Sequence, residues 1–276
     1  MDYQQVIYEK KDHVAVITLN RPERMNSMTI TMQRELSHAW QDVKKDPNVT
    51  VAILTGTGDR AFCAGLDVAE LKERASTGSV VPTGDSPRSS PLENGVWKPV
   101  ICALNGMCVG GAITMVGQSD IVIAAEHAVL IDSRVTVGQV AMGGTMELLR
   151  KAPLGEVFKL AYLGRGYRLT AQRMYDFGLV TDVVPLKDLM PKALEMAKAI
   201  AQNSPDALIA TKRAVWNSAH VGLRDAIAQG WEVFKEYQGS GGHPDQTEGP
   251  NAFLEKRAAK WTPGHARFSE KLPSEK

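Results

Sequence analysis

Two glycine-rich junctions contain the residues whose types and spacing are suited to chemistry. Residues 54–67 continue an apolar run at 51–54, and residues 105–112 continue a second apolar run at 100–104; each passes through glycines toward a helical pattern. Glycine lets the backbone approach a ligand closely, and the first N–H groups of a helix have no partner within it. Each junction alone is compatible with an ordinary glycine-rich loop. Together they could direct two N–H groups at one carbonyl oxygen on which negative charge develops.

Two further motifs flank these junctions. Residues 19–27 have the sequence LNRPERMNS, and residues 248–257 have the sequence EGPNAFLEKR. With the motifs in this order and spacing, the sequence resembles the crotonase (enoyl-CoA hydratase/isomerase) superfamily over nearly the whole chain. The resemblance implies an enzyme that processes an acyl-CoA thioester, as a hydratase, an isomerase or a related lyase of fatty acid metabolism.

The resemblance also implies which residues hold the substrate. The oxyanion donors would be the backbone N–H groups of Leu66 and Gly111, each worth about 3–4 kcal/mol of transition-state stabilisation in other systems. The ammonium group of Lys256 is suited to pair with a phosphate of coenzyme A. The implied substrate and coenzyme A contacts are Met25, Ser27, Ala64, Gly65, Leu66, Asp67, Met107, Ser133, Phe253 and Lys256. No separate cofactor is implied, because coenzyme A arrives as part of the substrate.

The acid–base residues depart from the family pattern. A hydratase of this type uses two glutamates to position water and to deliver a proton, but Thr114 and Arg134 stand at the matching positions. Neither a threonine nor a guanidinium acts as an ordinary general base. The positions that match the family's catalytic residues are therefore Leu66, Gly111, Thr114 and Arg134, and the two-glutamate mechanism is not expected. Asp132 is a candidate replacement base.

Several substitutes for the glutamates are open. Asp132 lies two residues before Arg134, so both side chains would share one face of an extended segment. They could hold a water or a carboxylate, or they could form a salt bridge that lowers the pKa of Asp132. Ser133 and Thr114 could orient water by hydrogen bonding. Glu147, in the helix expected to follow, is an alternative acid if its side chain points inward.

Two alternative functions are also open. The missing glutamates favour a crotonase-fold hydrolase or carbon–carbon lyase that acts on a CoA or β-dicarbonyl substrate. The other alternative is a catalytically inactive CoA-binding paralogue. Such a paralogue would bind saturated and unsaturated acyl-CoA alike without forming product.

Composition argues against several other classes of protein. The formal net charge is +1 over 276 residues, which disfavours a general nucleic-acid or anionic-membrane surface. No apolar run is long enough to span a bilayer, and the first residues lack a secretory signal pattern. Cys63, Cys102 and Cys108 are odd in number and form no CxxC pair. We therefore expect reduced thiols in a cytoplasmic protein and no metal site.

An α/β fold with a parallel sheet is expected to position these residues. Strands are predicted over 6–19, with a turn near the middle, over the apolar runs at 51–54 and 100–104, and over 120–125 and 128–131 on either side of a turn. Thr29 or Thr31 should cap a helix with a buried stripe, formed by Met32, Leu36, Trp40 and Val43. Beyond residue 141 the pattern is largely helical, and the last helix is predicted over 251–260.

The resemblance sharpens this architecture to a crotonase-like spiral of β-β-α repeats. Residues 1–200 would form the spiral core, and residues 201–276 a C-terminal helical region that mediates trimerisation. Residues 75–97, rich in Gly, Pro and Ser, are expected to form a variable, mobile segment that borders the acyl pocket. Because family members place their C-terminal helices against neighbouring subunits, a homotrimer or homohexamer is expected.

Overall fold

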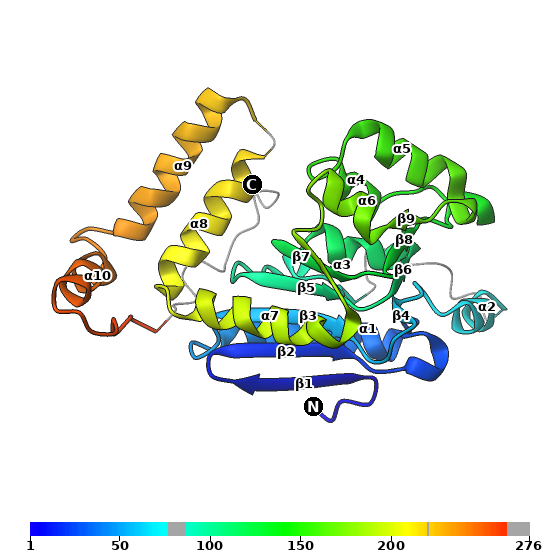
Figure 1. Cartoon of the computed structure of the whole chain (residues 1–276), viewed down its shortest axis with the longest axis horizontal. Helices are drawn as coiled ribbons and strands as arrows, with labels where there is room; N and C mark the ends of the chain where they lie inside the picture. Colours follow the sequence, from blue (N-terminus) through cyan, green and yellow to red (C-terminus); the bar gives the residue numbers. More distant parts are fainter. Residues whose placement is uncertain (77–86, 220, 264–276) are drawn as a thin grey trace.

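A six-stranded sheet forms one layer of the molecule (Figure 1). In the computed structural model, which describes residues 1–76, 87–219 and 221–263, the strand order is β1-β2-β3-β5-β7-β10. β1 pairs with β2 in antiparallel fashion, and the later neighbours are parallel. The strands are β1 (Val6–Lys11), β2 (Val14–Leu19), β3 (Val51–Gly56), β5 (Val100–Leu104), β7 (Ile121–Ala125) and β10 (Asp182–Val184). The predicted parallel α/β architecture is confirmed.

A second sheet of four short strands carries the two glycine junctions. Its order is β4-β6-β8-β9, in which β4, β6 and β8 are parallel and β9 is antiparallel to β8. The strands are β4 (Ala61–Cys63), β6 (Met107–Val109), β8 (Val129–Ile131) and β9 (Leu169–Thr170). The two strands predicted over 120–125 and 128–131 lie in different sheets, with β7 in the larger and β8 in the smaller.

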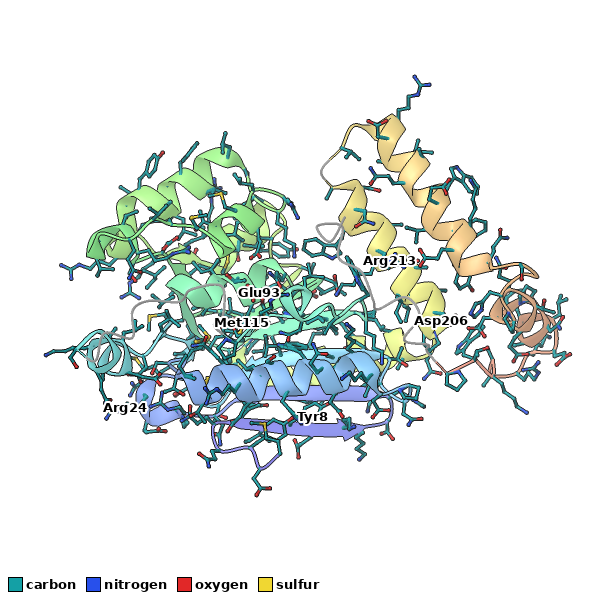
Figure 2. All side chains as sticks on the ribbon, turned by 180° about the vertical axis from the view of Figure 1, so that it is seen from behind. Tyr8, Arg24, Glu93, Met115, Asp206 and Arg213 are labelled. Atoms are coloured by element: carbon teal, nitrogen blue, oxygen red, sulfur yellow. The ribbon has the colours of Figure 1, made fainter. Side chains whose placement is uncertain are left out.

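Two long helices cover opposite faces of the larger sheet. α7 (Leu186–Ala201) lies in front of it in Figure 1, and α1 (Ile30–Lys45) lies in front of it in the reverse view of Figure 2. Thr29 caps α1, since its side chain accepts a hydrogen bond from the N–H of Met32 at 3.1 Å. The predicted stripe is confirmed: Met32, Leu36, Trp40 and Val43 are fully buried.

The C-terminal helices project from this core (Figure 1). α8 and α9 pack together around a small separate cluster that includes Trp97, Ile209 and Val233. Within the described residues, no helix combines the length and the apolar character needed to cross a membrane. The shorter or later helices are α2 (Val68–Ser76), α3 (Ile113–Gly117), α4 (Gly144–Leu148), α5 (Leu154–Leu163), α6 (Ala171–Asp176), α8 (Pro205–Ser218), α9 (Leu223–Gln238) and α10 (Asp245–Leu254).

The last helix begins and ends six residues earlier than predicted. α10 starts at Asp245 and includes Pro250, whereas the prediction placed the helix after that proline. The start is fixed by tertiary contacts, because the buried carboxylate of Asp245 accepts hydrogen bonds from Ser204 and Thr262. Such contacts override a local sequence signal that otherwise ends helices.

The segment expected to be mobile is in part packed. Residues 77–86 lie outside the described residues, but Ser90, Asn94, Val96 and Trp97 are buried. Asn94 accepts a hydrogen bond from Ser37 of α1 at 3.0 Å through its side-chain oxygen. The Gly, Pro and Ser content of the segment therefore reflects tight turns against α1 rather than a lack of structure over 87–97.

Candidate active site

Three loops that carry predicted site residues leave the same edge of the smaller sheet. β4, β6 and β8 are adjacent and parallel, with Cys63 beside Cys108 and Val109 beside Ile131. The residues that follow these strands (64–67, 110–114 and 132–134) therefore emerge together at the carboxyl ends. Ligands of α/β proteins bind at this edge of a parallel sheet.

A short backbone bridge turns the N–H of Leu66 away from the described backbone acceptors. Met28 donates its N–H to the carbonyl of Gly65 at 2.8 Å and accepts the N–H of Asp67 at 2.9 Å. In a parallel pairing, the residue between these two points its own N–H to the opposite side. Leu66 accordingly donates no backbone hydrogen bond to any residue that the structure describes.

The N–H of Gly111 has no acceptor within its own helical turn, because of its place at the start of that turn. Gly111 is the second residue of the 3-10 turn η3 (Gly110–Ala112), which leads directly into α3, so its N–H precedes the first hydrogen bonds of the turn. No described residue accepts it. A Cβ at Gly65, whose φ is +86°, would stand 2.9 Å from the carbonyl oxygen of Val109. The two loops thus touch, and only glycine permits it.

A network of polar side chains joins the Arg-Pro loop to the first junction. Ser27 donates to the carboxylate of Asp67 at 3.0 Å, and Arg21 donates to the same oxygen at 3.1 Å. The other carboxylate oxygen accepts the N–H groups of Ala69 and Glu70 at the start of α2. Burial alone would raise the pKa of Asp67, but these hydrogen bonds hold it below its usual value.

Two asparagines that sequence reasoning missed fix the backbone of both loops. Asn26 has a left-handed backbone (φ 54°) and donates to the carbonyls of Thr57 and Ala61 at 3.0 and 2.9 Å. Asn105 accepts the N–H of Gly56 at 3.1 Å through its side-chain oxygen. The sequence does contain a signal for both residues, since each Asn stands at a turn. Asn also tolerates the left-handed region better than other side chains.

Thr114 and Arg134, at the two expected glutamate positions, bind the same turn. The hydroxyl oxygen of Thr114 accepts the N–H of Gly144 at 2.9 Å. The guanidinium of Arg134 donates from Nη1 to the carbonyl of Met142. Both side chains therefore support the chain between residues 142 and 144, just before α4.

Asp132 is fully committed to internal hydrogen bonds. Its side chain is completely buried and accepts Nε and Nη2 of Arg134 at 2.8 and 2.7 Å. It also accepts the hydroxyl of Thr145 at 2.7 Å and the backbone N–H of Arg134 at 3.2 Å. Burial would raise the pKa of Asp132, but the bonds from Arg134 and Thr145 lower it overall. The arrangement is the salt bridge considered from the sequence, and it disfavours Asp132 as a base.

Glu147 points away from the turn and toward α3. Its carboxylate accepts Nε2 of Gln118 at 2.6 Å, and its second oxygen, Oε2, is buried with no partner among the described residues. Gln118 in turn accepts the N–H groups of Leu92 and Glu93. Burial raises the pKa of Glu147 to about 7. Glu147 therefore titrates near neutrality, one helical turn beyond the contact between Gly144 and Thr114.

The predicted coenzyme A contacts do not all come together in one chain. Met25, Ser27 and residues 64–67 surround the first junction, and Ser133 adjoins the second. Phe253, 83% exposed, and Lys256 lie at the end of α10, which Figure 1 places at the opposite end of the molecule from α2 and β4. Within a single subunit, these two residues are not part of the site.

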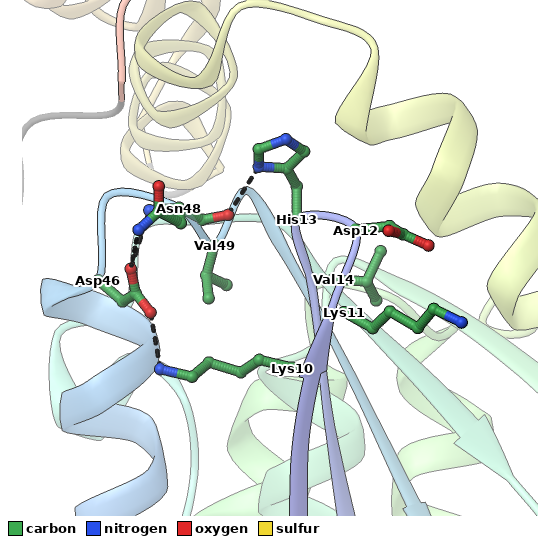
Figure 3. Close-up of a pocket in the computed structure, with 8 residues that line it drawn as sticks. All are labelled: Lys10, Lys11, Asp12, His13, Val14, Asp46, Asn48 and Val49. Carbon is green, nitrogen blue, oxygen red and sulfur yellow. Dashed lines mark hydrogen bonds and ion pairs between the residues drawn. The ribbon is translucent and has the colours of Figure 1, made fainter.

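A surface hollow of about 280 Å³ lies elsewhere (Figure 3). Its lining includes His13, whose ring bonds the carbonyl of Asn48 at 2.8 Å, and Lys10, which pairs with Asp46 at 2.6 Å. It is formed at the amino ends of β2 and β3, at the opposite edge from the loops described above. Among the described residues, no group of three or more His, Cys, Asp or Glu side chains is placed to hold a metal ion.

The family model for enoyl-CoA hydratase/isomerase matches residues 9–264. The Bacillus subtilis protein YngF, which carries the same family name, is 38% identical over 255 residues, covering 91% of this chain and 95% of that protein. A short-chain-enoyl-CoA hydratase of Clostridium acetobutylicum is 32% identical over 265 residues, covering 93% and 97%. The crystal structure of an enoyl-CoA hydratase/isomerase from Mycobacterium paratuberculosis superposes with a TM-score of 0.85 at 33% identity, covering 95% and 99%. The fold is thus similar to that of solved enoyl-CoA hydratase/isomerase structures.

Proposed function

The chain belongs to the enoyl-CoA hydratase/isomerase family, and we propose that it uses the N–H groups of Leu66 and Gly111 to stabilise an acyl-CoA enolate. The observation that carries this proposal is the pair of N–H groups, on two touching loops, that no described residue accepts. Preorganised donors need no reorientation as charge develops on the thioester oxygen, so they lower the barrier to enolisation or addition.

The proton transfers are proposed to differ from those of a two-glutamate hydratase. Thr114 and Arg134 each bind the 142–144 turn, and Asp132 is saturated with hydrogen bonds. None of the three is available as an ordinary base. This favours, as a second candidate, a reaction in which the enolate arises by carbon–carbon cleavage of a β-dicarbonyl substrate, or binding without turnover.

Hydration of crotonyl-CoA by the purified protein, followed at the enone absorbance, tests the first candidate. Gly111→Pro removes one proposed donor. Gly155→Pro is the matched control, because Gly155 lies in the first turn of α5, where proline is tolerated and where no other atom lies within 4 Å of an added Cβ. Hydration that Gly111→Pro abolishes and Gly155→Pro retains, with both variants folded, supports the oxyanion hole. Bound crotonyl-CoA without hydration would exclude a hydratase.

We further propose that the chain assembles into a homotrimer or a dimer of trimers. Two separate apolar surfaces support this: α9 exposes Leu223 (78%) and Trp231 (58%), and α5 exposes Tyr162 (72%) and Leu154 (56%). Two different surfaces that bind each other between copies generate a ring when the rotation between neighbouring copies closes, as a rotation of 120° does for a trimer. Another copy would then bring Phe253 and Lys256 to a site that they do not reach in one chain. Sedimentation of the protein and of Trp231→Glu tests this, and a monomeric parent protein would exclude it.

A further inference from the structure

One backbone carbonyl joins the three chain segments that lead to the proposed oxyanion donors. The carbonyl oxygen of Ala61, the first residue of β4, accepts Nδ2 of Asn26 at 2.9 Å and Nδ2 of Asn105 at 3.3 Å. Both asparagines are buried, with 0% and 3% of their surfaces exposed. The joined segments are residues 25–28, 56–66 and 105–111.

The other hydrogen bonds of these two side chains also go to backbone groups. Asn26 donates to the carbonyl of Thr57 at 3.0 Å and accepts the N–H of Arg21 at 2.9 Å. Asn105 donates to the carbonyl of Gly58 at 2.9 Å. Each amide therefore uses its N–H groups and its oxygen on the protein's own backbone. Any role of these side chains in the reaction must be indirect.

Gly56 leaves the space in which the two side chains meet. Its N–H donates to Oδ1 of Asn105 at 3.1 Å. A Cβ on Gly56 would stand 2.9 Å from that same oxygen, 2.9 Å from Nδ2 of Asn26 and 2.7 Å from the carbonyl oxygen of Phe62. An apolar side chain in place of either asparagine would leave buried backbone groups without their partners. The cluster thus requires a glycine and two asparagines that are distant in sequence.

Each joined segment continues directly to an oxyanion donor. Asn26 shortly precedes Met28, whose backbone bridge orients the N–H of Leu66. β4 runs from Ala61 toward the same N–H group. Asn105 precedes β6, which ends where η3 and the N–H of Gly111 begin. A displacement at the shared carbonyl would therefore be transmitted to both donors.

The two short strands cannot fix this alignment by themselves. β4 and β6 are three residues long, and their pairing shifts register between Ala61 and Cys63. An irregularity of this kind disrupts the ladder locally, so few backbone hydrogen bonds hold the strands in line. The bonds from Asn26 and Asn105 supply a second constraint at the amino ends of both strands.

We propose that Asn26 and Asn105 are positioning residues that set the separation and direction of the N–H groups of Leu66 and Gly111. The inference rests on the proposed oxyanion hole. Because a hydrogen bond weakens steeply with distance and angle, a small shift of β4 against β6 reduces the polarisation of a bound thioester carbonyl while the loops stay folded. The asparagines thus act on the reacting carbonyl without touching it.

Infrared difference spectra of bound butyryl-CoA, labelled with carbon-13 at C1, measure this polarisation. Hydrogen bonds to the thioester oxygen weaken the C=O bond, so the parent protein should lower its stretching frequency relative to free butyryl-CoA. Asn105→Ala and Asn26→Asp each remove one of the two bonds to Ala61, and each should lose about half of that shift or more. The affinity of Asn105→Ala for free coenzyme A, which lacks the thioester oxygen, should stay within about twofold of the parent value.

Glu35→Ala is the control for a loss of stability alone, because its carboxylate holds the backbone of residues 4 and 5. It should retain the full frequency shift. Urea unfolding shows that each variant is folded, and two variants at separate positions keep the test decisive if one of them does not fold. A shift that survives in the asparagine variants, or one that Glu35→Ala loses equally, would overturn the inference and leave the oxyanion hole standing. Butyryl-CoA bound to the parent protein without any shift would overturn both.

Discussion

Thr114 and Arg134 hold the two ends of one three-residue turn, the threonine through the N–H of Gly144 and the arginine through the carbonyl of Met142. The two positions at which the family pattern requires glutamates thus serve here as supports for the chain before α4. A glutamate at 134 would place a second carboxylate beside the buried Asp132, which like-charge repulsion opposes. The presence of an arginine rather than a glutamate at position 134 therefore goes together with the buried aspartate at position 132.

Arg134→Met should lower the free energy of unfolding by about 3–5 kcal/mol, because it leaves the buried carboxylate of Asp132 without its cation. Urea unfolding measures this. Adding Asp132→Asn should recover much of the loss, since the stranded charge is gone. The matched control is Arg173→Met, which breaks an Arg–Glu156 pair with a half-exposed arginine and should cost below about 1 kcal/mol. Equal losses of unfolding free energy for Arg134→Met and Arg173→Met would contradict the role of Arg134 as the cation that balances Asp132.

Glu147 should make stability fall as the pH rises through neutrality. Its pKa of about 7 in the folded protein lies above the ordinary 4.5, so the folded state binds this proton more tightly than the unfolded chain. Between pH 5 and 8 this single group should therefore remove about 2–3 kcal/mol of stability. Urea unfolding at both pH values should show a smaller decrease for Glu147→Gln than for the parent protein. The control variant Glu195→Gln, at an exposed glutamate, should show the same decrease in stability between the two pH values as the parent protein.

Glu35 should be required to hold the N-terminal residues on α1. It is 1% exposed, and its two carboxylate oxygens accept the backbone N–H groups of Gln4 and Gln5 at 2.8 Å each. Glu35→Ala leaves both N–H groups without this acceptor and should cost about 2–3 kcal/mol, with faster hydrogen exchange at residues 4 and 5. Glu9→Ala, at an exposed position of β1, should change stability by less than about 0.5 kcal/mol. Unchanged exchange at residues 4 and 5 would refute this role.

Much of the fold could be predicted from the sequence because its signals are local. The spacing of Met32, Leu36, Trp40 and Val43 follows the helical period, and Thr29 is a favoured cap. Polar partners distant in sequence could not be predicted. Nothing near Asp132 in the sequence shows that Thr145 completes its hydrogen bonds, because that contact depends on how α4 packs against α3.

The candidate site was predictable in its backbone and less so in its side chains. A glycine allows the backbone to approach another group closely. The glycines at 65 and 110–111 therefore allowed the two junctions to be identified from residue type. Phe253 and Lys256 could not be placed, because sequence order does not show that α10 lies at the far end of the molecule (Figure 1). The orientation of Glu147 depends equally on packing, since Gly117 leaves the space that its carboxylate occupies.

The contact between Gly65 and Val109 should be essential for binding an acyl-CoA. Gly65→Ala would place a methyl group 2.9 Å from the carbonyl oxygen of Val109 at a φ of +86°, so the loops must separate and the N–H of Leu66 must move away from Gly111. We expect at least a tenfold loss of butyryl-CoA affinity by calorimetry, with a stability loss of about 1–3 kcal/mol. The control is Gly166→Ala, at a glycine that lacks a positive φ and has no other atom within 4 Å of an added Cβ. If Gly65→Ala binds butyryl-CoA like the parent protein, the spacing of these two loops does not govern the site, and the paired-donor arrangement must be abandoned.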